Sequence, residues 1–319
     1  MIARLKGKRI LVAGANGFIG ANLLKNLLGS DLHIRGTYFR NKPKINDDRI
    51  EYLQLNLENK KDCETACKDI DIVFMCAANS SGAAVIETTP LVHLTPNVVM
   101  NSLMLEAAYT ASVGRFVFIS SNTVYPHVNF AVKEGDVNYQ FFDKYHIVGW
   151  MKLFSEEMCK MYSSHIKSPM STLVVRPGNL YGPYDKFNPS ESKVIAALVR
   201  RFFLAEEPLE VWGDGNDIKD FLYIDDFIDA LLSVSMDYNF NGPINIASGV
   251  PHTIKDVINA LALITKRRDL VVNYDAAKPT MIPVRLINCF LLNSQFKWSP
   301  KYSLFEGLKK TYDWYFKNN

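Results

Sequence analysis

The sequence predicts an α/β protein built around a doubly wound parallel sheet, and three observations support this fold class. Short apolar runs of strand length alternate with amphipathic stretches of helix length through the first half of the chain. A glycine turn directly follows the first apolar run, as is typical of βαβ units. Residues 177–183, rich in proline and glycine, then interrupt the alternation and indicate a change of domain. We expect a large domain of residues 1–178 and 220–248, and a smaller C-terminal domain of residues 179–219 and 249–319.

Composition and charge are those of an ordinary globular protein, with 319 residues, 48% of them hydrophobic and 22% charged. The net charge of +3 is weak and scattered, which argues against a nucleic-acid or membrane-surface partner. The five cysteines form no Cys-x-x-Cys pair, so free thiols in a reducing cytoplasm are expected rather than a zinc site or disulfides. Glycines interrupt the first apolar run too early for a signal peptide, and no apolar run reaches membrane-spanning length.

The first unit comprises a strand at residues 8–13, the glycine turn at 14–20 and a helix at 21–28. Gly14, Gly17 and Gly20 suit a tight turn, the close approach of backbone to a pyrophosphate, and packing of the helix on the strand. A glycine pattern alone has many false positives, but strand, turn and helix here follow in the required order. We therefore predict a Rossmann-type dinucleotide site.

The second strand, residues 33–38, ends where an acidic residue commonly holds the adenosine ribose, yet Tyr38, Phe39 and Arg40 stand there. The Arg40 guanidinium suits a 2′-phosphate and favours NADP over NAD. A solvated loop arginine is an almost equally good explanation, so the choice between NAD and NADP stays open.

The alternation continues with strands at residues 51–57, 71–76, 115–119 and 171–176 and helices at 60–68 and 97–112. Ala77 and Ala78, directly after the strand at residues 71–76, are small enough for a nicotinamide to lie against backbone. The segment from Ser120 to Pro126 gathers hydroxyl side chains at the carboxyl end of a central strand, where open α/β sheets bind ligands. Serines at such a transition can also be turn formers.

A helix predicted at residues 145–157 places Val148, Lys152, Ser155 and Cys159 on one face. Lys152 therefore interrupts a small and apolar stripe. In isolation, a lysine that snorkels from a half-buried face would be the favoured explanation. The glycine turn and the hydroxyl cluster favour a lysine at a catalytic centre.

In the second half, residues 184–219 combine basic side chains, an aromatic residue and turn glycines, as a nucleotide diphosphate pocket would. A solvated, loop-rich cap is the alternative. We expect a helix at 220–236, a strand at 243–247, and helices alternating with loops up to Trp314.

Four segments together resemble the extended short-chain dehydrogenase/reductase family of nucleotide-sugar enzymes, most closely the GDP-fucose synthases. Beyond the glycine turn, they are Ser120–Pro126 (SSNTVYP), Asn179–Leu198 (NLYGPYDKFNPSESKVIAAL), Trp212–Asp226 (WGDGNDIKDFLYIDD) and the tail Lys278–Trp314. The resemblance covers essentially the whole chain. It implies a C-terminal substrate domain that closes over a nucleoside-diphosphate sugar, with NAD or NADP as cofactor.

The resemblance also implies roles for individual residues. Ser121 would hydrogen-bond the reacting oxygen, and Lys152 would bind the nicotinamide ribose and lower a neighbouring pKa. The implied cofactor contacts are Gly14, Asn16, Gly17, Phe18, Ile19, Gly20, Arg40, Asn56, Leu57, Ala77, Ala78, Lys152 and Pro177. The implied substrate contacts are Ser81, Asn122, Asn179, Lys193, Val194, Arg201, Trp212, Lys219 and Arg285.

Three positions depart from the family pattern. Val148 stands where the Tyr-x-x-x-Lys motif has its tyrosine, Thr123 replaces the cysteine base of epimerisation, and Lys193 replaces its histidine partner. Because alkyl and alcohol groups are poor acids and bases near neutral pH, we expect hydride transfer without efficient epimerisation. Thr123, water or a displaced Tyr145 would then carry the proton.

The resulting prediction is an NAD(P)-dependent oxidoreductase acting at C4 of a GDP-linked hexose, deoxyhexose or heptose in polysaccharide precursor synthesis. A 3,5-epimerase/4-reductase using Lys193 is one alternative, and a non-catalytic nucleotide-sugar binder is another. The helices at residues 97–112 and 145–157 resemble the pair that forms a dimer interface in this family, so a homodimer is expected.

Overall fold

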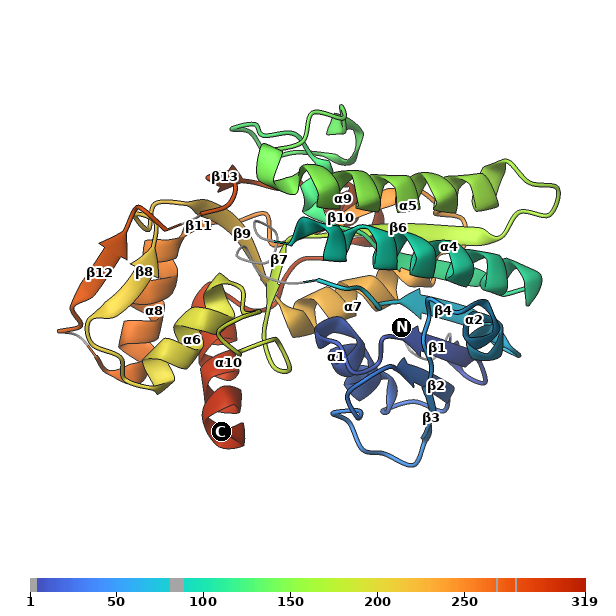
Figure 1. Cartoon of the computed structure of the whole chain (residues 1–319), viewed down its shortest axis with the longest axis horizontal. Coiled ribbons are helices and arrows are strands. Elements are labelled where there is room, and N and C mark those ends of the chain that lie inside the picture. Colours follow the sequence, from blue (N-terminus) through green and yellow to red (C-terminus); the bar gives the residue numbers. More distant parts are fainter. Residues whose placement is uncertain (1–4, 81–88, 268, 279) are drawn as a thin grey trace.

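The architecture is organised around a seven-stranded parallel sheet, seen in a computed structural model that describes residues 5–80, 89–267, 269–278 and 280–319 (Figure 1). The strand order is β10-β6-β5-β4-β1-β2-β3. The chain adds strands toward one edge from β1 to β3 and toward the other edge from β4 onward, which confirms the predicted doubly wound sheet. The strands are β1 Arg9–Ala13, β2 His33–Tyr38, β3 Ile50–Gln54, β4 Ile72–Met75, β5 Arg115–Ile119, β6 Ser171–Pro177 and β10 Pro243–Ile246.

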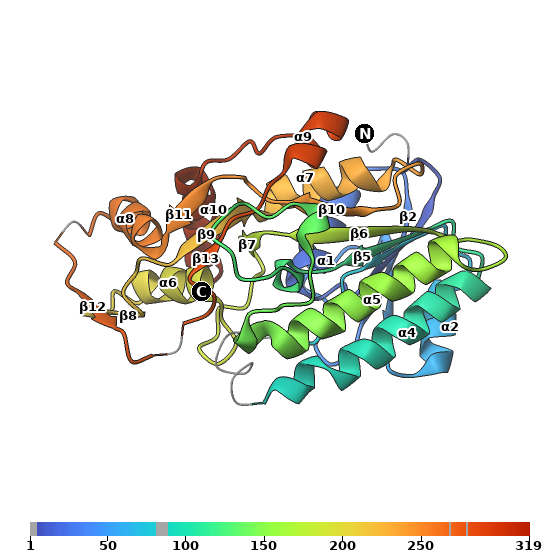
Figure 2. The same cartoon turned by 90° about the horizontal axis from the view of Figure 1, so that it is seen from above.

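Helices cover both faces of this sheet (Figure 2). One face carries α2 (Lys60–Cys67), α4 (Thr95–Thr110) and α5 (His146–Ser164), which pack side by side. The other face carries α1 (Phe18–Leu27) and α7 (Ile224–Ser235), which pack against each other. Because both faces are covered, every residue of β4 and β5 is buried, which explains their continuous apolar runs.

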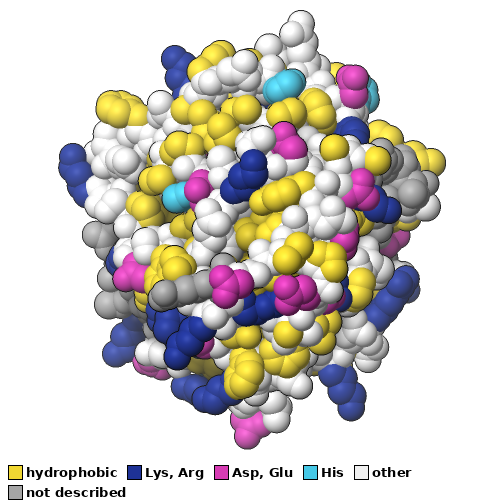
Figure 3. Space-filling view, turned by 90° about the vertical axis from the view of Figure 1, so that its left-hand side faces the viewer, with side chains coloured by type: hydrophobic (Ala, Val, Ile, Leu, Met, Phe, Trp, Pro, Cys, Tyr) yellow, Lys and Arg dark blue, Asp and Glu magenta, His cyan; other side chains and the backbone are white. Residues whose placement is uncertain are grey.

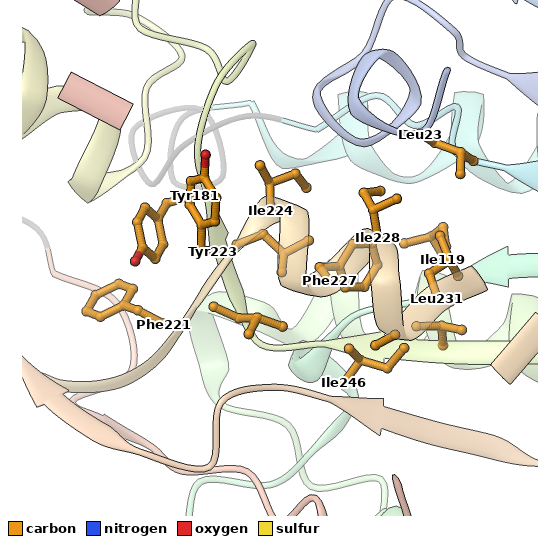
Figure 4. Packing of buried hydrophobic residues seen from close by; sticks show 14 of the residues in the cluster. Leu23, Ile119, Tyr181, Phe221, Tyr223, Ile224, Phe227, Ile228, Leu231 and Ile246 are labelled. Atoms are coloured by element: carbon orange, nitrogen blue, oxygen red, sulfur yellow. The ribbon is translucent and has the colours of Figure 1, made fainter. Parts of the chain in front are cut away.

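The larger part of the core lies under α7 (Figure 4). Ile224, Phe227, Ile228 and Leu231 follow the helical spacing of a single apolar stripe and are all buried. Leu23 of α1 belongs to the same cluster. This packing ties the first βαβ unit to the chain that returns from the C-terminal region.

The C-terminal region, meaning residues 179–223 and 249–319, contains two small sheets and a helical layer (Figure 1). In the first sheet, β9 (Ile218–Tyr223) pairs with β7 (Asn179–Tyr181), β11 (Pro251–Thr253) and β13 (Val284–Arg285). In the second, β8 (Leu209–Trp212) pairs with β12 (Val272–Asp275). The helices are α6 Val194–Phe203, α8 Ile254–Thr265, α9 Phe290–Phe296 and α10 Leu304–Asn318.

Two sequence predictions about this region were wrong in detail. The helix expected at 220–236 begins only at Ile224, because Asp220–Tyr223 pair with β7 and β11 as part of β9. The stretch expected to hold only helices and loops contains β11, β12 and β13, which are too short to give a periodic pattern. The expected domain boundary at residue 220 falls inside β9, while α7 and β10 do return to the large sheet.

Surface and thiol properties follow the composition. All five cysteines are free, and four of them are buried, as expected.

The face on the C-terminal side mixes hydrophobic, basic and acidic side chains (Figure 3). Among the helices of the described residues, none combines the length and apolar character needed to cross a bilayer.

Candidate active site

The glycine turn brings the ends of β1 and β4 into contact. Gly14 has φ +79°, and a Cβ there would lie 2.6 Å from Ala77 Cα. A Cβ on Gly20 would collide with the carbonyl oxygen of Gly14. Gly17 caps α1 without a side-chain hydrogen bond, so the first amides of that helix lack a side-chain acceptor. These features fit a pyrophosphate at the helix N-terminus, with backbone alone forming the cradle.

Side chains around the turn fit the remaining part of a dinucleotide. Asn16 donates from Nδ2 to Asn41 O (3.2 Å), while its buried Oδ1 has no hydrogen-bond partner among the described residues. Arg40 is exposed and lies over the Phe39 ring, 5.3 Å from its centroid. The buried Asn16 oxygen can accept a hydrogen bond from a ligand, and the accessible Arg40 guanidinium can pair with a phosphate group.

Three other implied cofactor residues are engaged within the protein. The Asn56 amide donates to Asp62 Oδ2 (2.8 Å) and the Asn56 side chain accepts from Glu58 N (3.1 Å). The carbonyl of buried Leu57 accepts from Cys63 Sγ (3.1 Å). The carbonyl of Pro177 accepts from Asn122 Nδ2 (3.0 Å). These bonds shape the loops after β3 and β6, and they leave the cofactor role of these residues a prediction.

The hydroxyl cluster forms a short 3₁₀ turn, η3 (Asn122–Val124), directly after β5. Ser121 caps it, with Oγ accepting from Thr123 N (3.2 Å). Thr123 Oγ1 is buried without a hydrogen-bond partner among the described residues. Gly149 of α5 packs closely here, since a Cβ on it would lie 2.9 Å from Thr123 O and 2.6 Å from Phe141 Cδ1. The absence of a side chain at residue 149 thus lets α5 approach the backbone of residues 120–125, the Ser121 turn.

Lys152 reaches the same strand end from α5. Its Nζ donates to Ile119 O (2.8 Å) and lies 4.9 Å from the centroid of the Phe118 ring. Burial lowers the pKa of Lys152 to about 8, with Glu156 acting to raise it and Lys193 to lower it. The structure therefore brings Lys152 to the end of β5, two residues before Ser121, and places Lys193 within electrostatic reach. Val148, one turn earlier on α5, is half-buried.

Tyr145 faces the C-terminal region. It ends a 3₁₀ turn, η5 (Asp143–Tyr145), immediately before α5. Burial raises the pKa of its hydroxyl to about 12, while Arg285 and a backbone hydrogen bond from Ile282 act to lower it. The neighbouring Lys144 donates to Thr280 O (2.9 Å). Tyr145 thus lies in a 3₁₀ turn that leads directly into α5, and its hydroxyl lies near Ile282 and Arg285.

Arg285 is buried and binds the backbone after η3. It is 1% exposed, and Nη1 and Nη2 donate to the carbonyls of Pro126 (2.9 Å) and Tyr125 (3.1 Å). Both terminal nitrogens therefore hold the end of the Ser121 turn, whereas the buried Nε has no hydrogen-bond partner among the described residues, and a contact between Arg285 and the substrate stays a prediction. Sequence alone could not reveal the two hydrogen bonds, because the two partners lie about 160 residues earlier in the chain.

The other implied substrate residues are spread over the C-terminal region. Lys219 is buried, forms an ion pair with Asp217 (3.2 Å), and donates to Ile282 O. Arg201 donates to Glu210 O and lies 3.6 Å from the Glu206 carboxylate. The rest have these positions: Asn179 Nδ2 donates to Asp220 O (3.1 Å), Trp212 is 41% exposed, and Lys193 and Val194 are exposed at the start of α6, whereas Ser81 lies outside the described residues.

The sequence analysis missed a buried polar network behind the Ser121 turn. Glu156 of α5 binds Arg176 of β6 at 3.0 and 2.5 Å and accepts from Ser120 Oγ. Arg176 also donates to Tyr125 Oη (3.0 Å). One signal was available, because Glu156 follows Lys152 by one helical turn and is a second charge on a largely apolar face.

Taken together, an open α/β sheet with a glycine turn at β1 and a serine and a lysine at the end of β5 defines a dinucleotide-dependent enzyme. The chain belongs to the NAD dependent epimerase/dehydratase family, whose model matches residues 10–247. It is an NAD(P)-dependent enzyme of the short-chain dehydrogenase/reductase superfamily.

Three similar proteins illustrate the relationship. A putative GDP-L-fucose synthase 2 of Arabidopsis thaliana is 28% identical, with 98% of this chain and 93% of that protein covered. The GDP-mannose 3,5-epimerase 1 of Oryza sativa subsp. indica is also 28% identical, with coverages of 96% and 81%. The structure of UDP-glucuronic acid 4-epimerase from Bacillus cereus with UDP-glucuronic acid and NAD has a TM-score of 0.83 at 25% identity, covering 98% of this chain and 100% of that one.

Proposed function

We propose that the protein oxidises or reduces C4 of a GDP-linked sugar by hydride transfer, without efficient epimerisation. The observation that carries the proposal is the position of Lys152, whose ammonium donates to Ile119 O beside the Ser121 turn. The nicotinamide, when bound, supplies or accepts the hydride. Ser121 would donate a hydrogen bond to the oxygen on C4, and the Lys152 charge would stabilise that oxygen as it becomes an alkoxide.

The nucleotide-sugar part of the proposal is supported by the C-terminal region and by the relatives. Lys219 and Arg285 are two cations close enough for their charges to act on each other, and Asp217 is the carboxylate beside Lys219. Such a setting favours a diphosphate. The relatives named for GDP-fucose and GDP-mannose support guanine as the base and a hexose or 6-deoxyhexose as the sugar, with a heptose as a further possibility. Exposed Arg40 favours NADP among the two dinucleotides.

The absence of epimerisation is proposed from residue chemistry. Val148 and Thr123 carry an alkyl group and an alcohol, which exchange protons poorly near neutral pH. The proton released or taken up at the C4 oxygen would pass through water or the Thr123 hydroxyl, whose Oγ1 has no hydrogen-bond partner among the described residues.

A second function, 3,5-epimerisation coupled to 4-reduction, is favoured by one observation. Lys193 lies close enough for its charge to act on Lys152, so an amine is available near the site where a proton donor would be needed. The relatives include GDP-mannose 3,5-epimerases. A purely binding role is disfavoured, because the chain belongs to an enzyme family and retains both Ser121 and Lys152.

The deciding experiment supplies a GDP-4-keto-6-deoxyhexose and reduced cofactor in deuterated water. We expect cofactor oxidation and reduction at C4, with no solvent deuterium at C3 or C5 by mass spectrometry and NMR. The Lys152→Ala variant should lose the reaction by a factor on the order of 10²–10³, because one preorganised electrostatic group is removed. Deuterium at C3 or C5 that disappears in a Lys193→Met variant would establish the epimerase/reductase function instead.

Self-association also remains a proposal. Trp150, Phe154 and Met161 of α5 are exposed large hydrophobic residues, and α5 packs beside α4 on the outer face of the sheet (Figure 2). Covering such side chains in a second copy would remove apolar surface from water.

A further inference from the structure

The Ser121 turn is held at both ends by one buried polar network. At its start, Ser120 Oγ donates to Glu156, and Ser120 N donates to Val175 O of β6 (2.7 Å). At its end, Tyr125 Oη accepts from Arg176 Nη1 (3.0 Å) and donates to Asn245 Oδ1 (2.6 Å). Glu156 and Arg176 join the two ends, since Nε and Nη2 of Arg176 each donate to one oxygen of the Glu156 carboxylate.

Helix α5 is fixed on the end of β5 by two side chains one turn apart. Lys152 donates to the carbonyl of Ile119, and Glu156 accepts from the side chain of Ser120, the next residue. Residues four apart on a helix lie on the same face. The pair therefore contacts two consecutive residues directly before Ser121, and a displacement of Glu156 would move both the serine turn and the lysine.

Glu156 also faces the charge of Lys152. It is 6% exposed, so its charge is poorly screened by solvent. The groups acting on Lys152 are Glu156 and Cys159 of α5, Cys76 after β4, and Lys193 before α6. Those contacting Glu156 are Ser120 after β5 and Arg176 of β6, with the Tyr125 hydroxyl within reach of its charge. Within the part of the chain that the structure describes, Glu156 is the only carboxylate whose charge acts on Lys152.

We propose that Glu156 is a positioning residue for the hydride transfer, which holds the Ser121 turn in place against α5 and sets a carboxylate one helical turn from the Lys152 ammonium. The proposal rests on the proposed function, because it assumes that Ser121 and Lys152 act on the same substrate. It assigns Arg176 the role of orienting the buried Glu156 side chain through two hydrogen bonds.

The test compares Glu156→Gln with Glu157→Gln in the full-length protein. Glu157 is the adjacent carboxylate, half exposed and 3.8 Å from Lys160, so it is a matched control. For Glu156→Gln we expect kcat to fall about tenfold or more with little change in cofactor affinity, because Ser121 is no longer held in a fixed position relative to Lys152. The alkaline limb of the kcat profile should move to lower pH, because the pKa of Lys152 falls when the nearby carboxylate is neutralised. Glu157→Gln should change neither quantity.

A second readout does not depend on turnover. NMR titration of isotope-labelled lysine, assigned with Lys152→Ala, should show about a tenfold larger acid dissociation constant for Lys152 in Glu156→Gln than in the wild type. An unchanged titration would overturn the electrostatic role even if the protein acts on no GDP-sugar. If the titration shifts while no GDP-sugar reacts, the proposed substrate is wrong and the role of Glu156 stands.

Ser120→Ala separates positioning from charge, and serves if Glu156→Gln does not fold. It removes the hydroxyl that binds Glu156 and leaves the Glu156–Arg176 ion pair in place. We expect kcat to fall about tenfold while the titration of Lys152 stays as in the wild type. An unchanged kcat would overturn the positioning role.

Discussion

Two buried arginines hold the Ser121 turn from opposite sides, and they are stabilised in different ways. Arg176, from the large sheet, is paired with the Glu156 carboxylate. Burial lowers the pKa of Arg176, but hydrogen bonds and the charge of Glu156 outweigh this effect and leave the pKa above its usual value. Arg285, from β13 of the C-terminal region, donates to neutral backbone carbonyls, and burial lowers its pKa to about 10.

This difference distinguishes the large sheet, where Arg176 has a structural role, from the C-terminal region, where we expect the substrate to bind. On the side of the large sheet, cation and carboxylate balance each other, so the turn keeps its place without a ligand. On the C-terminal side, Arg285 and Lys219 face Tyr145 and Asp217, and positive charge is less fully balanced. A diphosphate seated there would supply the missing negative charge. We therefore expect substitutions on the first side to affect stability and those on the second to affect substrate affinity.

The largest expected effect is on the free energy of unfolding. Arg176→Met should lower it by about 3–5 kcal/mol, because the Glu156 carboxylate would be left buried and unpaired. Arg285→Met should cost about 1–3 kcal/mol, since two backbone carbonyls lose their donor. Urea unfolding of both variants measures this difference. Equal losses would contradict the comparison, and the double variant Arg176→Met/Glu156→Gln should be more stable than Arg176→Met alone.

The next effect is on substrate affinity. Lys219→Gln should raise the KM for the GDP-sugar about tenfold and change kcat less than about threefold, because a charge-assisted contact to phosphate would be lost. Lys309→Gln on α10, an exposed lysine paired with Asp313 (2.6 Å), is the control and should change neither constant. A fall in kcat at constant KM would place Lys219 with the scaffold instead. Steady-state kinetics at fixed cofactor concentration distinguishes these outcomes.

The smallest expected effect belongs to Tyr145. Because its hydroxyl faces Ile282 and Arg285 rather than the end of β5, Tyr145→Phe should lower kcat by less than about threefold. Single-turnover measurements of cofactor absorbance would show this directly. Complete loss of turnover would mean that Tyr145 carries the proton, as a displaced tyrosine would.

Local patterns allowed much of the fold and part of the site to be predicted. The glycine turn, the hydroxyl cluster after β5 and the Lys152 helix each lie within a short segment, and their strands are ordered by rules of parallel sheets. Arg285 and Lys219 could not be placed in this way. Their partners lie in distant segments, and only folding shows that Arg285 contacts Tyr125 and Pro126. Residues 220–223 of β9 were predicted as helix because they run directly into the strongly amphipathic α7.

The close contact of Gly149 with Thr123 has a consequence for how this site can vary during evolution. The position of α5 on the sheet depends on the absence of a side chain at Gly149 and on the hydrogen bonds of Lys152 and Glu156. The side chain of Val148 makes none of these three contacts. A lineage could therefore exchange the side chain at 148, and with it the route of the proton, while the helix keeps its place on the sheet. Residue 149 has no such freedom, because any larger side chain would press on the backbone that carries Ser121.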